Sequence, residues 1–165
     1  MTKNISISFS YREFDREEEL NPDDLELVKG AREAALNAYA PYSKFRVGAV
    51  VRLESGTLIR GSNIENAAFP SGICAERSAL SNAASNHPDD KTVSIAIAAI
   101  DEDGLTDEPV PPCGNCRQVI TEEELRNGKQ IRVILSGRKK TLVIDRSSDL
   151  LPLQFNKNNL KISLP

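Results

Sequence analysis

The stretch CAERSAL, residues 74–80, places a cysteine two positions before a glutamate in a chain that has only three cysteines. The other two cysteines, Cys113 and Cys116, form a Cys-x-x-Cys pair in PCGNCRQVI, residues 112–120. Each stretch opens an expected helix, and the chain before it contains an apolar, β-branched run that predicts a strand. Helix starts that follow strands of one sheet can face each other at its carboxyl edge. The two stretches therefore predict an α/β fold that brings the three thiols together.

Working outward, hydrophobic periodicity and turn residues predict the other elements of the chain. A helix is expected over residues 21–40, where Asn21 can cap, Pro22 occupies the first turn and Pro41 ends the helix. The other expected elements are helices over 74–86 and 113–127, a hairpin of strands over 45–54 and 57–65, strands over 94–100, 131–135 and 141–145, and a short helical turn over 149–155.

The N-terminal residues carry a separate pattern. Ile5, Ile7, Phe9 and Tyr11 recur at every second position, which is the period of a strand with one buried face. The alternation therefore predicts an added strand at this end of the chain.

Strands that alternate with helices predict an α/β domain with a three-layer αβα sandwich and one mixed five-stranded sheet. The last two of these strands are joined only by residues 136–140. Because a parallel crossover needs a dozen or more residues, these two strands must pair antiparallel. The 165 residues, 39% of them apolar, suit a single domain over residues 1–165.

Charge and composition exclude several function classes. A net charge of -3 and 5% aromatic residues argue against a surface that neutralises phosphates or stacks bases, so no nucleic-acid partner is expected. No apolar run approaches the ~20 residues that cross a bilayer, and the start lacks a basic stretch followed by an apolar one. We expect no membrane contact and a cytoplasmic location. Three cysteines cannot all pair with one another, which leaves reduced thiols, metal ligands or a nucleophile.

The three thiols suit zinc. Helix N-termini favour thiolates, and three protein ligands leave the fourth tetrahedral position open, as in catalytic zinc sites. A redox pair, half of a structural zinc site and three buried structural cysteines are the alternatives. Glu76 favours catalysis, because a carboxylate two positions after Cys74 can lean toward the metal and move protons without being a ligand. A zinc deaminase signature has this glutamate, followed later by Pro-Cys-x-x-Cys.

Four blocks extend the match well beyond the cysteines: YAPYSKFRVGA (39–49), NIENAAFPSGICAERSAL (63–80), PCGNCRQVI (112–120) and LLPLQF (150–155). In these blocks the chain resembles the zinc-dependent cytidine/deoxycytidylate deaminase family, in its small, oligomeric, free-nucleoside type. The resemblance covers residues 24–155 as a deaminase core and leaves residues 1–23 as an N-terminal extension. It implies a homotetramer whose subunits complete one another's pockets.

The resemblance also implies roles for individual residues. Cys74, Cys113 and Cys116 would hold Zn²⁺, and Glu76 would carry the proton. Substrate contacts would come from Phe45 against the base, Asn63 and Glu65 on the ribose 3'-hydroxyl, the main chain of Ala75 on the base, and Phe155 in a neighbour's site, with Phe69 near the same boundary. Arg77 would donate hydrogen bonds to the cysteine sulfurs.

Each of these side chains also has a simpler interpretation. Phe45 and Phe155 could be core residues, Asn63 a turn residue, Glu65 a solvated charge and Arg77 an exposed helix arginine. The function that the resemblance implies is hydrolytic deamination of cytidine and deoxycytidine to uridine and deoxyuridine in pyrimidine salvage. The alternatives are a deaminase of a related base or aminopyrimidine nucleoside analogue, and a noncatalytic zinc-binding module.

Overall fold

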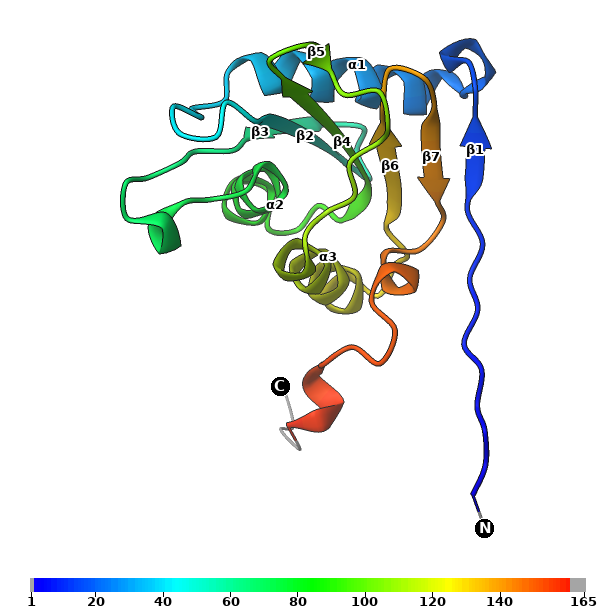
Figure 1. Ribbon diagram of the computed structural model, residues 1–165. Coiled ribbons are helices and arrows are strands. Elements are labelled where there is room, and N and C mark those ends of the chain that lie inside the picture. Colours follow the sequence, from blue (N-terminus) through cyan, green and yellow to red (C-terminus); the bar gives the residue numbers. More distant parts are fainter. Residues whose placement is uncertain (1, 161–165) are drawn as a thin grey trace.

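The computed structural model describes residues 2–160 and has an α/β fold built on one mixed sheet (Figure 1). The strand order is β1-β7-β6-β4-β2-β3, and the short β5 pairs with the end of β4. The strands are β1 Arg12–Phe14, β2 Arg46–Leu53, β3 Leu58–Ser62, β4 Thr92–Asp101, β5 Gly104–Leu105, β6 Arg132–Ser136 and β7 Thr141–Ile144. The helices are α1 Pro22–Leu36, α2 Ala75–Asn86 and α3 Gly114–Asn127, with 3-10 turns at 17–19, 69–71, 147–150 and 157–159.

The pairing confirms the central part of the predicted topology. β2 and β3 form the expected hairpin, β4 and β6 run parallel on either side of α3 in sequence, and β6 and β7 are antiparallel. The predicted number of five strands is wrong, because the sheet has seven. The two additional strands are β1, which joins the edge at β7, and the two-residue β5.

The strand predicted at Ile5 to Tyr11 is wrong in its position. Only Arg12–Phe14 pairs with β7, with Arg12 opposite Val143. In this register Tyr11 reaches Ile144, the last residue of β7, so the chain before Tyr11 runs past the end of β7 and has no neighbouring strand among residues 2–160. Residues 2–11 form an extended arm without secondary structure, directed away from the sheet (Figure 1). The alternation describes one apolar face, but none of residues 2–160 covers that face.

The cap predicted for the first helix is confirmed. The side chain of Asn21 accepts a hydrogen bond from the backbone N–H of Asp24 at 2.8 Å, and Pro22 is the first residue of α1. The helix ends at Leu36, earlier than predicted from Pro41. Beyond it the backbone N–H of Tyr39 donates to the carbonyl of Asn63, so this part of the chain joins the end of β3 instead of continuing the helix.

The helices divide between the two faces of the sheet. Leu27, Val28 and Ala31 of α1 pack with one set of strand residues, whereas α2 and α3 pack with the other set. A Cβ atom at Gly61 of β3 would overlap the backbone of α2 at Ala75 and Ala79. This close contact fixes the start of α2 against the sheet.

Among residues 2–160, no helix combines the length and the apolar character needed to cross a membrane.

Candidate metal centre and substrate pocket

The three cysteines meet where α2 and α3 begin. Cys74 is the N-cap residue of α2, Cys113 is the N-cap residue of α3, and Cys116 lies in the first turn of α3. β3 and β4 are both antiparallel to β2, so they run in the same direction and their C-terminal ends lie at the same end of the sheet. The three sulfur atoms lie within 4.8 Å of one another. The sequence prediction that the thiols converge is therefore confirmed.

The surroundings of these thiols disfavour three neighbouring thiolates. Burial raises the pKa of Cys116, and the nearby Glu76 carboxylate raises it further. Burial is also the main cause of the raised pKa of Cys74. At Cys113 burial acts in the same direction, but hydrogen bonds from the Cys116 backbone and from the other two thiols outweigh it and lower the pKa. A divalent cation would stabilise all three thiolates together.

The cluster fits Zn²⁺. Sulfur ligands about 2.3 Å from a tetrahedral zinc lie about 3.8 Å apart, so a separation of up to 4.8 Å requires only small movements. One ligand, Cys116, is fully buried, whereas Cys113 is exposed. The open side of the cluster faces the pocket, because Cys74 and Cys113 line it and Cys116 does not.

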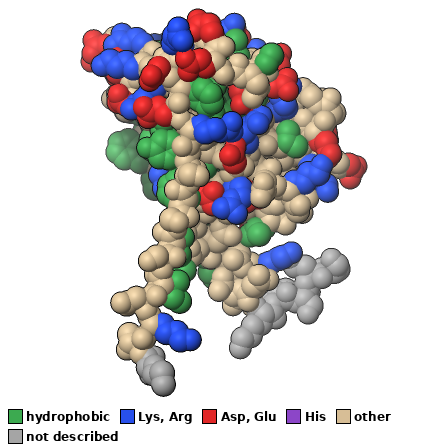
Figure 2. Space-filling view, turned by 90° about the vertical axis from the view of Figure 1, so that its right-hand side faces the viewer, with side chains coloured by type: hydrophobic (Ala, Val, Ile, Leu, Met, Phe, Trp, Pro, Cys, Tyr) green, Lys and Arg blue, Asp and Glu red, His purple; other side chains and the backbone are tan. Residues whose placement is uncertain are grey.

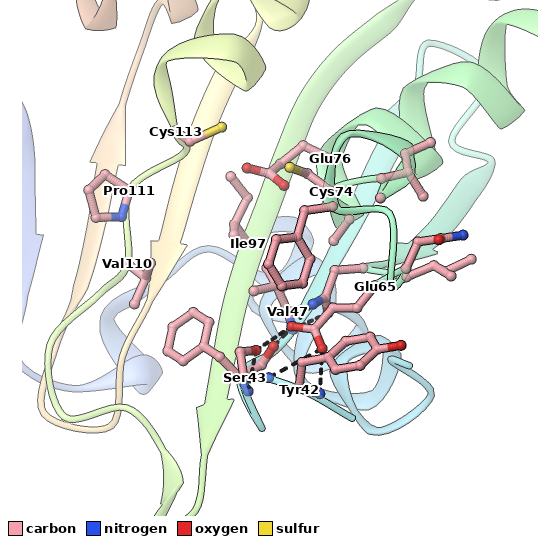
Figure 3. Close-up of a pocket in the computed structure, with 18 residues that line it drawn as sticks. Tyr42, Ser43, Val47, Glu65, Cys74, Glu76, Ile97, Val110, Pro111 and Cys113 are labelled. Atoms are coloured by element: carbon pink, nitrogen blue, oxygen red, sulfur yellow. Dashed lines mark hydrogen bonds between the residues drawn. The ribbon is translucent and has the colours of Figure 1, made fainter. Parts of the chain in front are cut away.

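Glu76 is the ionisable residue beside the thiols. It is the second residue of α2 and is only 5% exposed. Figure 3 shows its carboxylate directed across the pocket toward the sulfur of Cys113, with Cys74 beside it. A buried carboxylate at a pocket wall, next to a metal-ligand cluster, has the geometry of a general acid and base.

A pocket of about 630 Å³ extends from the thiols to the loop before β2. Four residues predicted to contact substrate line it: Phe45, Asn63, Glu65 and Ala75. The volume lies within the range of about 300–1,000 Å³ that is typical of small-molecule sites. The wall between the two ends is mostly apolar and includes Val47, Ile97 and Val110.

Glu65 forms the end of the pocket far from the thiols. Its carboxylate accepts hydrogen bonds from the backbone N–H of Tyr42 at 2.9 Å, from the N–H of Ser43 at 3.3 Å and from the Ser43 hydroxyl. The Ser43 hydroxyl is the main cause of the lowered pKa of Glu65, and the two backbone N–H groups add to it. Glu65 is therefore a half-buried residue whose carboxylate is held in place, not a freely solvated charge.

Asn63 lies at the end of β3 and joins it to the start of β2. Its Oδ1 accepts from the N–H of Val47 at 2.7 Å, and its Nδ2 donates to the carbonyl of Phe45 at 3.0 Å. These contacts fix the backbone on both sides of Arg46. Asn63 therefore organises the chain next to the pocket, between β3 and the isolated bridge at Ile64.

Comparison with known proteins places this geometry in a family. Residues 21–128 match the family model described as the cytidine and deoxycytidylate deaminase zinc-binding region. The chain belongs to this deaminase family. A cytidine deaminase of Halalkalibacterium halodurans is 41% identical over 134 residues, covering 81% of this chain and 95% of its own. A cytidine deaminase of Mycobacterium tuberculosis is 33% identical over 141 residues, covering 84% and 96%.

The fold agrees with solved structures of the deaminase family. The crystal structure of cytidine deaminase from Burkholderia pseudomallei superposes with a TM-score of 0.67 at 34% identity, covering 79% of this chain and 97% of the other. The likeness reaches almost the full length of that structure. About a fifth of the present chain lies outside it.

Two residues predicted for the deaminase site do not line the pocket. The side chain of Phe155 is 58% exposed, beyond the 3-10 turn that follows β7. Arg77 is half-buried on α2, and its role toward the sulfurs remains a prediction. The pocket of one chain is therefore formed without either side chain.

Sequence reasoning missed a pair of residues that follow Cys116. Arg117 donates to the carbonyl of Pro112 at 2.9 Å and to that of Leu150 at 3.0 Å. Gln118 donates to the carbonyl of Phe155 at 2.8 Å. The pair connects the metal-ligand turn to the C-terminal segment. The motif Cys-Arg-Gln was visible, but its hydrogen-bond acceptors lie too far along the chain for a pattern to reveal.

The rim of the pocket holds a second missed contact. Tyr42 and Phe69 meet edge to face, with ring centroids 6.1 Å apart and an interplanar angle of 76°. Both rings are largely exposed, Phe69 by 75%. Tyr42 lies in the block quoted for the resemblance, but its position before Phe45 gave no signal of a contact with Phe69.

Proposed function

We propose that this chain is a zinc-dependent deaminase that hydrolyses cytidine and deoxycytidine to uridine, or deoxyuridine, and ammonia. The observation that carries the proposal is one pocket with a cluster of three thiols and the buried Glu76 at one end and Glu65 and Asn63 at the other. A metal site for hydrolysis and a polar site for a sugar are thus separated by an apolar wall suited to a base.

Glu76 moves protons at the reacting end of the pocket. When bound by Cys74, Cys113 and Cys116, zinc supplies a Lewis acid that activates water for attack on C4 of the base. Glu76 would accept a proton from that water and transfer it to N3, and would later move the proton of the new C4 hydroxyl group to the departing amino group, which leaves as ammonia. Its burial and its position two residues after Cys74 support this role, because the carboxylate cannot turn away into solvent.

At the sugar end, the side chains of Glu65 and Asn63 each have one hydrogen-bonding position that the protein itself does not use. A carboxylate has about four acceptor positions, and Glu65 uses three of them on Tyr42 and Ser43. The amide of Asn63 has two N–H donors and uses one on Phe45. A hydroxyl group both donates and accepts, so the remaining acceptor and donor suit the ribose 3'-hydroxyl. Phe45 and the main chain of Ala75, both in the pocket lining, would contact the base.

Ultraviolet absorbance tests the reaction directly. Zinc-loaded protein should reduce the absorbance of cytidine and of deoxycytidine with release of ammonia, while Glu76→Gln protein with the same zinc content should not. Cytosine without a sugar should react poorly, because the sugar end of the pocket is then unoccupied. A flat trace with cytidine from fully metallated protein would contradict the proposal, and faster turnover of cytosine would favour a base deaminase instead.

We also propose that the active form is a homotetramer of single-domain subunits, each with a three-layer αβα core over residues 24–155. Phe155 and Phe69 are both exposed, so both side chains are free to contact a neighbouring subunit, as shared pockets require. The cytoplasmic location remains a prediction from the sequence.

Mixing two impaired variants tests the sharing of pockets, because Phe155→Ala should weaken substrate binding and Glu76→Gln should lose nearly all turnover. Phe155→Ala removes the side chain proposed to enter a neighbour's pocket, and Glu76→Gln removes the proton carrier of its own pocket. After subunit exchange, mixed assemblies should regain part of the activity, because some pockets then hold both native residues. Confirmed mixed assemblies without any recovery would argue against a shared site.

A further inference from the structure

The N-terminal arm, residues 2–11, lies outside the residues that match the deaminase family and outside the pocket. Its apolar side chains are all exposed: Ile5 by 85%, Ile7 by 59%, Phe9 by 49% and Tyr11 by 53%. Hydrophobic side chains follow one side of the arm in the space-filling view (Figure 2). A stretch of this length with one apolar face is an incomplete β-structure, because its backbone and its apolar side have no partner within the described part of the chain.

We propose that the arm pairs with the arm of a second copy of this chain, as two antiparallel strands about a twofold axis through Ser8. The proposal goes beyond the deaminase activity and does not depend on it. Two identical segments related by a twofold axis present the same surface to each other, so no other molecule is needed to complete the pair.

The sequence of the arm selects this register. Directly opposite residues share a face, so the odd-numbered apolar residues must meet odd-numbered residues. An axis through Ser8 pairs Ile5 with Tyr11 and Ile7 with Phe9, which gives each apolar residue an apolar partner. Moving the axis to residue 7 sets Tyr11 against a lysine, and moving it to residue 9 sets Ile5 against a glutamate. Aromatic side chains opposite β-branched ones are favourable cross-strand pairs.

The charged residues at the two ends of the arm also favour this register. With the axis at Ser8, Lys3 of one copy lies opposite Glu13 of the other, on both sides of the axis. Glu13 already has Lys140 at 3.5 Å, and at 43% side-chain exposure it can accept a second cation. The residues between, 4–10, carry no charge, so no like charges oppose each other along the arm.

The ribbon formed in this way is anchored at both ends. β1 is the edge strand of its sheet and pairs only with β7, so its outer edge is open. In the proposed register, residues 2–4 of one copy lie along Arg12–Phe14 of the other. Each arm therefore adds to the partner's sheet, which overcomes the marginal stability of an isolated two-stranded ribbon.

A cysteine introduced at the twofold axis tests the register. Ser8→Cys in the zinc-loaded full chain should form an interchain disulfide under mild oxidation, seen as a dimer on a non-reducing gel. Asn4→Cys is the matched control, because two copies of residue 4 would lie about 27 Å apart at ~3.4 Å per residue. We expect at least tenfold more linked dimer from Ser8→Cys than from Asn4→Cys.

Further substitutions in the Ser8→Cys background test which side chains lie opposite each other in the paired arms. Ile7→Asp should reduce the linked dimer at least tenfold, because it places a charge opposite Phe9. Lys3→Glu should reduce it roughly fivefold, as expected for two lost ion pairs and two like-charge contacts, and adding Glu13→Lys should restore it. Equal amounts of linked dimer from Asn4→Cys and Ser8→Cys would indicate random collision of the arms. No linked dimer from Ser8→Cys would indicate that the arm binds something other than a second arm. Either result would overturn the proposal.

Discussion

The two ends of the pocket differ in how complete they are without a ligand. At the sugar end Glu65 is held by Tyr42 and Ser43, and these contacts lower its pKa. At the metal end burial raises the pKa values of Cys74 and Cys116, which disfavours their thiolate forms in the absence of a cation. The end with Glu65, which we propose binds the sugar, is held in place by the chain itself, whereas the metal end relies on a cation to stabilise its thiolates.

Because of this difference, substitutions at the two ends of the pocket should affect different properties of the protein. Changes at the metal end should alter the response of the protein to zinc as well as its turnover. Changes at the sugar end should alter substrate preference and the local loop, and leave the metal in place. The predictions below test this division.

The largest effect is expected from Glu76→Gln. The amide keeps the shape of the side chain but cannot carry a proton, so kcat should fall by at least ~10²–10⁴-fold while zinc content stays at one equivalent. Steady-state kinetics with metal analysis checks this. Glu65→Gln serves as the control, because it should lose far less turnover. Unchanged turnover in metallated Glu76→Gln protein would remove Glu76 from the mechanism.

Removal of zinc should destabilise the wild-type protein strongly. Binding stabilises the native state by about 4 kcal/mol when free zinc is 1,000 times its Kd, so a chelator should lower the melting temperature markedly. Cys113→Ala should bind little zinc and show almost no further decrease with chelator. Ser43→Ala, at the other end, should keep one equivalent and the full wild-type response. One zinc per chain in purified Cys113→Ala protein would contradict the ligand assignment.

Glu65→Gln should discriminate between substrates with and without a sugar. A buried or poorly paired polar group costs ~1–3 kcal/mol, which corresponds to a loss of roughly 5- to 150-fold in kcat/KM for cytidine. The loss on a base analogue without ribose should be much smaller. Comparing the two substrates in one assay measures the difference, and equal losses would show that Glu65 acts only on the loop around Ser43.

The smallest effect concerns pH. Because hydrogen bonds lower the pKa of Glu65 in the folded protein, their stabilising contribution is present above its unfolded pKa and is lost as pH falls through the folded value. Ser43→Ala removes the largest of these contributions, so the pKa of Glu65 should rise toward its ordinary value. A carbon-13 NMR titration of the Glu65 carboxyl group measures this. An unchanged pKa would mean that the backbone N–H groups suffice.

Local patterns predicted much of the fold. Asn21 and Pro22 define the start of α1, and the apolar runs on either side of Ser55 give the β2–β3 hairpin, because caps and turns depend on neighbouring residues. The convergence of the cysteines was also predictable, since two helix starts at one sheet edge bring Cys74 and Cys113 together. These predictions succeeded because residue types near one another in sequence decide them.

Features that depend on distant partners could not be predicted in this way. The alternation from Ile5 to Tyr11 gives a strand period, but it does not reveal whether the same chain supplies a neighbouring strand. The hydrogen bonds of Glu65 to Ser43 join residues 22 positions apart. Likewise, Gly61 carries no sign in the sequence that the backbone of α2 lies directly against it.

Arg117 and Gln118 link the metal centre to the C-terminal segment, so the order of that segment should depend on whether zinc is bound. Both follow Cys116 directly, and their side chains hold the carbonyl groups of Leu150 and Phe155. Loosening of the first turn of α3 therefore releases hydrogen bonds that fix the C-terminal segment. A trace of protease should cut within residues 151–160 faster in zinc-depleted protein than in zinc-loaded protein. The cleavage rate of the chain's tail thus measures metal occupancy without any substrate.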